Sequence, residues 1–304
     1  MEIAEVTEGE EARRWQAVLV AANPRTTTLE GFEDWRRQAG ETIWLLATEA
    51  GEDIAAGLAL TGWYSAPHQA RADVRVAPAY RGRGHALELY RALSAWADDR
   101  GVTELEGEVW EDDPTSLAWA ERQGFHESGR NSRLGLDLTA IEAPTPEPPP
   151  GIEIVTWAER PGTARGMYEV ALEAHPDIPG EEDSDIGTFE EWLSRDMRGA
   201  SDRPEATFVA LADGDVVGYA KLSLSLARDE VVMHDLTGVL RAWRGRGIAA
   251  ALKRTQIAWA KNAGYAKLET SNEVRNEPIR HLNEKHGYVL EPGEISLLGP
   301  LAPR

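Results

Sequence analysis

Two nearly identical glycine-arginine hexapeptides are the segments of this sequence best suited to bind phosphate. The first, RGRGHA, comprises Arg81, Gly82, Arg83, Gly84, His85 and Ala86, and the second, RGRGIA, comprises Arg244, Gly245, Arg246, Gly247, Ile248 and Ala249. Each lies between a β-rich run and a run with helical periodicity. A glycine-rich turn at the start of a helix exposes amide groups at the positive end of the helix dipole, and arginine adds a planar cation that suits phosphate oxygens. The hexapeptides therefore predict two diphosphate sites. Neither matches the glycine spacing of a dinucleotide fingerprint or a P-loop.

The hexapeptides belong to an internal duplication. A shift of 163 positions places Arg81 on Arg244, and the flanking sequence aligns without a gap. The same shift superposes Val76 on Val239, Leu89 on Leu252, Ala95-Trp96-Ala97 on Ala258-Trp259-Ala260, and Gly124-Phe125 on Gly287-Tyr288. A tight turn without a ligand is the alternative for one copy. Two copies in equivalent contexts favour a shared function.

A proline-rich segment, TAIEAPTPEPPPG at 139–151, separates the two copies. Proline fixes φ and removes an amide donor, so we expect an extended, semi-rigid linker. The sequence thus predicts an N-terminal domain at 1–140 and a C-terminal domain at 152–304, each of ordinary domain length.

The same order of elements is predicted in each half. In the second half, strands are expected at 152–157 and on both sides of a hairpin turn at Gly214, with helices at 163–174 and 188–197. A strand then leads into the hexapeptide, and a helix follows it as far as Gly264. The expected fold is α/β, with two tandem domains that each contain a mixed, mostly antiparallel sheet and flanking helices.

Composition excludes several classes of function. The chain contains no cysteine, so disulfides, thiol catalysis and thiolate metal sites are excluded. The net charge of −20 repels phosphate backbones and anionic membranes, so neither nucleic acid nor a membrane is an expected partner. The acidic N-terminus lacks the apolar core of a signal peptide, and we expect a cytoplasmic protein.

The strand, R-x-x-G-x-A loop and helix resemble the acetyl-CoA loop of the GNAT N-acetyltransferase superfamily. A second motif, Asn276-x-Pro278-x-x-x-Leu282-x-Glu284-x-x-Gly287-Tyr288, resembles the fourth-helix signature of that family. The first half carries Asp113, Leu117, Glu121, Gly124 and Phe125 at similar positions. Since the resemblance covers most of both halves, we interpret the chain as a tandem GNAT protein.

The resemblance implies that acetyl-CoA is the cosubstrate and that no metal takes part. It implies that the hexapeptides bind the diphosphate of the coenzyme and that Asn276 contacts it. The pantetheine arm is then expected along the strand before each loop, at Leu236, Thr237 and Val239 in the second half and at Val74 and Val76 in the first. An amide of that strand would polarise the thioester carbonyl, and an acceptor amine would attack it directly.

Asp235 is the preferred candidate for the base that deprotonates the acceptor amine. It alternates with His234 along the strand, and it shares its face with Thr237. A β-bulge, usual in the family, would shift that alternation and favour His234 instead. A structural role for both residues is the alternative. The nearest equivalents in the first half are Asp73 and Glu108.

The family's acid, a tyrosine seven residues after Asn276, is replaced by Asn283, and the first half has Ala120 at this position. Water or Tyr219 is the predicted substitute proton donor. Because Asn276 is matched by the negatively charged Asp113, the second half is the favoured catalytic domain. The first half would bind coenzyme silently or act as a scaffold, with His85 as a surface residue.

Three functions are compatible with these observations. The favoured one is N-acetylation of a small molecule with a primary amine, and the acidic loop at 180–185 would attract such a cation. A non-catalytic acyl-CoA-binding or ligand-sequestering protein is the second. The third follows from a resemblance to mycothiol synthase, a tandem member of the family, and predicts acetyl transfer to a cysteine-linked sugar amine.

Overall fold

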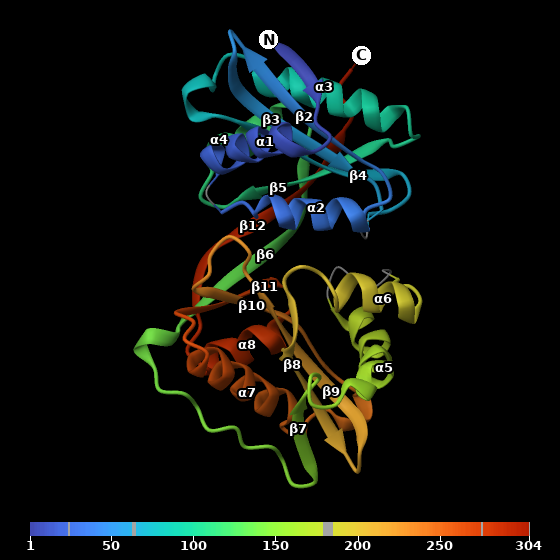
Figure 1. Ribbon diagram of the computed structural model, residues 1–304, viewed down its shortest axis with the longest axis vertical. Coiled ribbons are helices and arrows are strands. Elements are labelled where there is room, and N and C mark those ends of the chain that lie inside the picture. The colour runs from blue at the N-terminus through green and yellow to red at the C-terminus, as the bar shows by residue number, and fades with distance from the viewer. Residues whose placement is uncertain (24, 63–64, 179–184, 275, 304) are drawn as a thin grey trace. The chain divides into compact units, whose positions relative to one another are not determined.

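The computed structural model describes residues 1–304 except 24, 63–64, 179–184, 275 and 304. The chain forms two compact units (Figure 1). The first contains Met1–Arg130 and Glu294–Arg304, and the second contains Asn131–Gly293. Each unit is a sheet covered by helices on both faces, so the predicted α/β class is confirmed.

The sheet of the first unit has the strand order β1-β2-β3-β4-β5-β12, in which only β4 and β5 are parallel. The strands are β1 (Glu2–Glu5), β2 (Thr42–Glu49), β3 (Glu52–Leu60), β4 (Gln69–Val76), β5 (Glu104–Trp110) and β12 (Val289–Pro300). The helices are α1 (Gly9–Ala22), α2 (Leu29–Gln38), α3 (His85–Asp98) and α4 (Pro114–Arg122), with the 3-10 turn η1 (Pro78–Tyr80) before α3.

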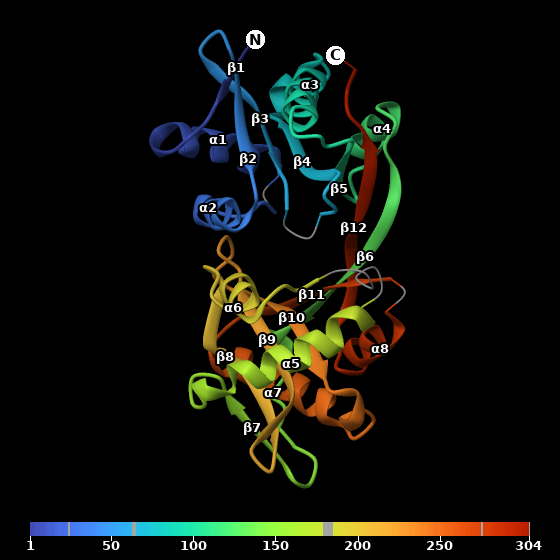
Figure 2. The same cartoon turned by 90° about the vertical axis from the view of Figure 1, so that its right-hand side faces the viewer.

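Apolar side chains fix the helices of the first unit on opposite faces of its sheet (Figure 2). Trp15 of α1 stacks on Trp44 of β2 with ring centroids 4.4 Å apart, and its indole nitrogen donates to the carbonyl of Gly57 at 3.0 Å. Leu89 and Leu93 of α3 pack against the other face. These contacts position the start of α3, where the first hexapeptide lies, at the end of β4.

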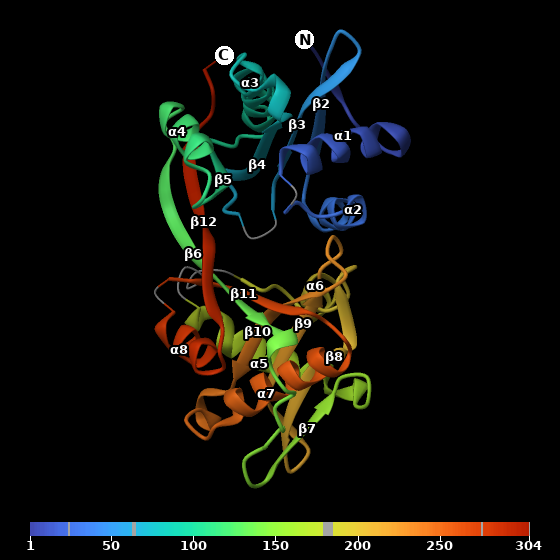
Figure 3. The ribbon, with the colours of Figure 1, turned by 90° about the vertical axis from the view of Figure 1, so that its left-hand side faces the viewer.

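The second unit repeats this plan with the strand order β6-β11-β10-β9-β8-β7, and only β10 and β11 are parallel (Figure 3). The strands are β6 (His126–Asp137), β7 (Ile152–Thr156), β8 (Asp202–Ala212), β9 (Asp215–Leu224), β10 (Val231–Val239) and β11 (Lys267–Glu273). The helices are α5 (Ala164–Ala174), α6 (Phe189–Asp196), α7 (Ile248–Asn262) and α8 (Glu277–Lys285), and the 3-10 turns are η2 (Leu138–Ala140), η3 (Pro161–Thr163), η4 (His175–Asp177) and η5 (Arg241–Trp243).

Local sequence signals explain where several of these elements begin and end. Gly214, with a φ of +92°, forms the hairpin turn between β8 and β9 as expected. Thr188 and Glu191 form a reciprocal capping box at the start of α6. Asn276 is the N-cap residue of α8, so the predicted fourth helix is confirmed.

The two copies exchange their last strands. Residues Asn131–Asp137 of β6 pair with β11 in the second unit, and residues Glu294–Pro300 of β12 pair with β5 in the first unit. The predicted boundary placed 1–140 in one domain and 152–304 in the other, and it did not include this exchange. Strand partners far apart in the chain leave no mark in local periodicity, which is why the duplication alone did not reveal them.

Candidate active site

The two hexapeptides fold alike. Gly84 and Gly247 are the N-cap residues of α3 and α7, with φ of +90° and +84°, a left-handed conformation that glycine adopts without strain. Among the described residues, the amides of Gly82–Ala86 and of Gly245–Ala249 donate to no carbonyl oxygen. Each loop therefore presents free amides at a helix N-terminus, which suits a diphosphate.

The arginines of the loops are held by the backbone. Arg81 Nε donates to the carbonyl of Val76 at 3.1 Å, and Arg244 Nε donates to that of Val239 at 2.9 Å. Arg83 and Arg246 each donate at 3.1 Å to a carbonyl four residues earlier in the chain. Arg81 also donates to the carbonyl of Ala22, and Arg244 pairs with Asp177 at 2.7 Å. These guanidinium groups thus tie each loop to neighbouring elements, whereas the loop amides keep no carbonyl partner among the described residues.

A cavity of about 760 Å³ lies in the first unit. Strands β4 and β5 pair only from Gln69–Glu104 to Arg71–Glu106, and beyond this point both strands line the cavity. Its wall continues to the first hexapeptide, including Arg81, Gly82, Gly84, His85 and Ala86. The strand positions Val74 and Val76, predicted to contact pantetheine, line it as well. One continuous cavity thus connects the separated strands to the free amides.

His85 is buried, with a relative exposure of 7%, so the prediction of a surface residue is wrong. His85 is the first residue of α3 and lines the cavity. Its Nε2 atom lies 4.0 Å from the Glu49 carboxylate, and it has no hydrogen-bond partner among the described residues.

Strands β10 and β11 of the second unit separate at the equivalent point, after Met233 and Glu269. The pairing of β10 with β9 contains an irregularity between His234 and Thr237, at the position where a bulge was considered. The next side chain after the separation, His234, is buried.

His234 is enclosed by polar side chains of α7 and by Tyr288, which precedes β12. Its Nδ1 atom lies 3.1 Å from Gln256 Oε1, and its Nε2 atom contacts the Tyr288 hydroxyl. Burial and the nearby charge of Lys253 hold the pKa of His234 well below its ordinary value. His234 is therefore neutral near pH 7, with both ring nitrogens occupied.

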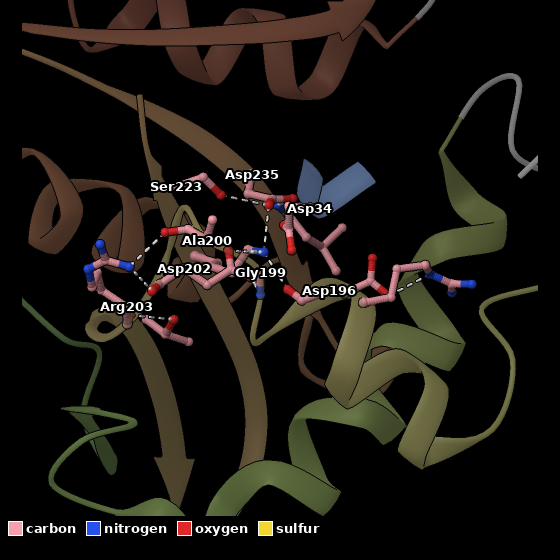
Figure 4. A network of polar contacts seen from close by, with 12 residues as sticks. Asp34, Asp196, Gly199, Ala200, Asp202, Arg203, Ser223 and Asp235 are labelled. Atoms are coloured by element: carbon pink, nitrogen blue, oxygen red, sulfur yellow. Dashed lines mark hydrogen bonds and ion pairs between the residues drawn. The ribbon is translucent and has the colours of Figure 1, made fainter. Parts of the chain in front are cut away.

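Asp235 lies in a charged network around Lys221 (Figure 4). Its carboxylate is 2.7 Å from Lys221 Nζ and accepts from Ser223 Oγ at 3.0 Å. Lys221 also contacts Asp202 at 2.9 Å. Partial desolvation opposes ionisation of Asp235, whose side chain is 43% exposed, but the Lys221 ammonium and these hydrogen bonds lower the pKa of Asp235 overall. A lowered pKa makes a carboxylate a weaker proton acceptor.

The Leu236 amide donates to the carboxylate of Asp235 at 2.7 Å. This amide is one of those expected to polarise the thioester carbonyl from β10, together with the strand positions Thr237 and Val239. In this conformation it already has a charged acceptor. A thioester oxygen at this position would have to displace the carboxylate.

Asn283 is fully buried in α8. Its Nδ2 atom donates to Asn272 Oδ1 at 3.0 Å, and its own Oδ1 atom has no partner among the described residues. Tyr219, considered as a substitute proton donor, is buried in the core beneath α5 and α6. Most of the acidic loop at 180–185, namely 180–184, lies outside the described residues.

Two buried lysines of the second unit were missed by sequence reasoning. Lys221 is 5% exposed on β9, and Lys253 is 1% exposed on α7. Each interrupts an apolar pattern at a position that periodicity places inside, in YAKLSL and in AALKRT. That inward position was the available signal. Burial lowers the pKa of Lys253 to about 7, whereas two carboxylates raise the pKa of Lys221 against the effect of burial.

Comparison with known proteins agrees with this geometry. The model of the acetyltransferase (GNAT) family matches residues 10–125 and 164–288. Mycothiol acetyltransferase of Brachybacterium faecium is 26% identical over 246 residues, which cover 78% of this chain and 70% of that protein. Streptothricin acetyltransferase of Streptomyces lavendulae is 34% identical over 91 residues, which cover 29% of this chain and 47% of that protein.

Solved structures share the fold over the whole chain. A tandem GNAT protein from the clavulanic acid biosynthesis pathway has a TM-score of 0.80 at 19% identity and covers 100% of this chain and 99% of its own. A GCN5-related N-acetyltransferase from Sphaerobacter thermophilus has a TM-score of 0.73 at 22% identity, with 99% and 96% covered.

Two α/β units of this kind, each with separated parallel strands that end at a glycine-rich loop, define a tandem acyl-CoA-dependent acyltransferase. The chain belongs to the GNAT acetyltransferase family. Within the described part of the chain, no helix is long and apolar enough to cross a membrane.

Proposed function

We propose that this protein is an acetyl-CoA-dependent N-acetyltransferase that acetylates the primary amine of a small molecule by direct attack in a ternary complex. The cavity of the first unit carries the proposal, because it joins the separated strands to the free amides of Gly82–Ala86. A diphosphate on these amides would direct the rest of acetyl-CoA toward the strands. The net charge of −20 favours approach of a cationic amine.

A prediction from sequence, that the second unit performs the chemistry with Asp235 or His234 as base, stays a prediction. Asn276 at the start of α8 and the second hexapeptide support a donor site in that unit as well. The ion pair of Asp235 with Lys221 and the burial of His234 favour structural roles for these two side chains.

Two alternatives have support of their own. An acyl-CoA-binding protein without turnover is favoured by Asn283 at the position of the family's tyrosine acid and by the occupied Leu236 amide. A mycothiol synthase-like activity is supported by the 26% identity to mycothiol acetyltransferase, and it predicts acetylation of a cysteine-linked sugar amine.

Matched substitutions at the loop glycines test the donor site. Gly84→Asn and Gly84→Asp place side chains of nearly equal size at a φ that Asn and Asp tolerate better than most residues, and only Asp adds a negative charge. We expect the Asp variant to bind acetyl-CoA at least about tenfold more weakly than the Asn variant, by isothermal titration calorimetry. The pair Gly247→Asn and Gly247→Asp tests the second unit in the same way. Equal affinities within both pairs would exclude the loops as diphosphate sites.

Thiol release from acetyl-CoA, measured against a panel of amines, tests the reaction. Because the chain contains no cysteine, a thiol reagent reports only the CoA product. Acetyl-CoA binding without thiol release on any amine would favour the non-catalytic alternative. The cysteine-linked sugar amine carries its own thiol, so for this acceptor the acetylated product is measured by mass spectrometry instead. Acetylation restricted to this acceptor would favour the mycothiol synthase-like alternative.

A further inference from the structure

Glu106 and Glu269 occupy equivalent positions in the two units. Glu106 is the last residue of β5 that pairs with β4, and Glu269 is the last residue of β11 that pairs with β10. Each carboxylate therefore lies where the parallel strands begin to separate, which is the expected location of the reacting end of acetyl-CoA. The surroundings of the two side chains nevertheless differ in charge.

Glu269 is neutralised by three cations. Its side chain is 1% exposed, and its carboxylate contacts Arg133, Arg228 and Lys267. Burial alone would raise the pKa of Glu269, but these partners lower it to about 2. A carboxylate with this many cationic partners is a poor proton acceptor, so Glu269 has a structural role.

Each of the three cations is absent from the equivalent position in the first unit. The repeat places Glu104 at the position of Lys267. Ser65, in the loop before β4, donates to Glu106, whereas Arg228, in the loop before β10, contacts Glu269. The strand register places Ser296 of β12 at the position of Arg133 on β6. The first two differences lie in the sequence of each half. The third arises from the strand exchange, since β12 replaces β6 as the neighbour of β5.

Glu106 consequently faces the cavity without a counter-ion. It lines the cavity and accepts one hydrogen bond, from Ser65 Oγ at 2.8 Å, and no arginine or lysine of the described residues forms an ion pair with it. The other two candidate carboxylates of this unit are paired, because Asp73 lies 2.7 Å from Arg75 and Glu108 contacts Arg71.

We propose that Glu106 is the general base of the first unit and that it binds the ammonium form of the acceptor, so that the first unit transfers acetyl groups to cationic amines. This inference rests on the proposed function, and it assigns chemistry to the unit that the sequence favoured less. The Ser65 hydroxyl occupies Glu106 Oε2 and orients the carboxylate, which leaves Oε1 to receive the proton.

Glu106 has to remove one proton from the ammonium group, because an amine with an ordinary pKa near 10.4 costs roughly 4–5 kcal/mol to neutralise at pH 7. The neutral nitrogen then forms the C–N bond to the thioester carbonyl carbon. The C–S bond breaks, and the sulfur leaves with its electron pair. One of the two remaining nitrogen protons passes to the sulfur and the other stays in the amide. Glu106 returns its proton to solvent.

Glu106→Gln tests this assignment, with Glu104→Gln as the matched control. Glu104 lies on the same strand and the same face but does not line the cavity. We expect Glu106→Gln to lower kcat/KM for an alkyl amine by about a hundredfold or more and to leave the affinity for acetyl-CoA unchanged. The control variant is expected to change kcat/KM by less than about threefold.

A second acceptor separates a base from a structural carboxylate. An aryl amine is already neutral at pH 7, so the penalty of Glu106→Gln is expected to fall to less than about tenfold. Equal penalties for both amines would overturn the assignment. If the Gln variant does not fold, Glu106→Asp is tested instead. Because this variant keeps the carboxylate, the ratio of kcat/KM for the alkyl amine to that for the aryl amine is expected to stay near the wild-type ratio. A clear fall in this ratio would also overturn the assignment.

The two proposals fail in different ways. If Glu106→Gln keeps the turnover of the wild type and Asp235→Asn loses it, the inference is overturned and the chemistry is placed in the second unit. An unaltered protein that binds acetyl-CoA and releases no thiol with any amine would overturn the proposed function.

Discussion

Arg133 of β6 and Glu269 of β11 form an ion pair in which the two side chains are 13% and 1% exposed. By sequence, Arg133 belongs to the first copy of the repeat and Glu269 to the second. Their contact holds the exchanged strand in the sheet of the second unit. Arg228 and Lys267 also form ion pairs with the Glu269 carboxylate.

Glu269→Gln is expected to lower the free energy of unfolding of the second unit by about 3 kcal/mol, because it removes the buried carboxylate that Arg133, Arg228 and Lys267 share. Urea denaturation followed by tryptophan fluorescence measures this change. Glu10→Gln is the control, since the ion pair of Glu10 with Arg13 is 76% and 69% exposed. Its expected cost is less than about 1 kcal/mol. Similar losses for both variants would show that the Glu269 cluster does not stabilise the exchange.

The same carboxylate predicts a dependence of stability on acid. The pKa of Glu269 is lowered from 4.5 to about 2 by its cationic partners, against the effect of burial. Because the folded state keeps this group ionised, its contribution is complete above about pH 4.5 and is lost as the pH falls toward 2. Melting temperatures of the wild type and of Glu269→Gln are therefore expected to converge between pH 5 and about 2.5. A constant difference over that interval would contradict the assigned pKa.

Lys253→Met is expected to raise the melting temperature at pH 7 by roughly 5 °C, because it removes the cost of burying an amine. Burial lowers the pKa of Lys253 from 10.5 to about 7, so the unfolded chain binds this proton more tightly than the folded chain does. The loss in free energy of unfolding that Lys253 causes therefore grows as the pH falls from 10.5 toward 7, and it is constant below pH 7. Thermal unfolding at pH 7 and at pH 10 measures it, and the variant should gain less at pH 10. A destabilised variant would instead indicate a favourable partner for the amine.

Deletion of Glu294–Arg304 is expected to abolish acetyl-CoA binding by the first unit, although the deleted residues follow the second unit in sequence. Strand β5 would lose its partner, the cavity would lose the wall at Leu297, and Tyr90 would lose the Pro300 carbonyl that accepts its hydroxyl at 2.5 Å. The exposed edge of β5 should also promote association. Calorimetry and size-exclusion chromatography test this, with a chain shortened by its last two residues as the control. Unchanged binding after the longer deletion would contradict the importance of the exchanged strand.

Asp235→Asn is expected to destabilise the second unit by about 2 kcal/mol and to leave acetyl-CoA binding by the first unit unchanged, because Lys221 would keep only Asp202 as a carboxylate partner. Ser223→Ala removes one hydrogen bond to the same carboxylate and should cost about 1 kcal/mol. Differential scanning calorimetry distinguishes these changes. A loss of turnover with unchanged stability would favour the role of Asp235 as a base.

The sequence by itself determined the duplication, the α/β elements and the two glycine loops. These features depend on short-range causes: the left-handed φ at Gly84 and Gly247, the turn at Gly214, and the alternation of apolar residues along each element. It also located the strand positions Val74 and Val76 that line the cavity.

Only the tertiary structure decided which carboxylates near the strand separation have counter-ions. The two strand-adjacent glutamates align in sequence, but the charge beside each depends on residues from distant segments and, for Arg133 and Ser296, on the strand exchange. Likewise, the ionisation of Asp235 is set by Lys221 on a neighbouring strand. Electrostatic interactions act through space, so the proton affinity of a side chain is decided by packing rather than by its position along the chain.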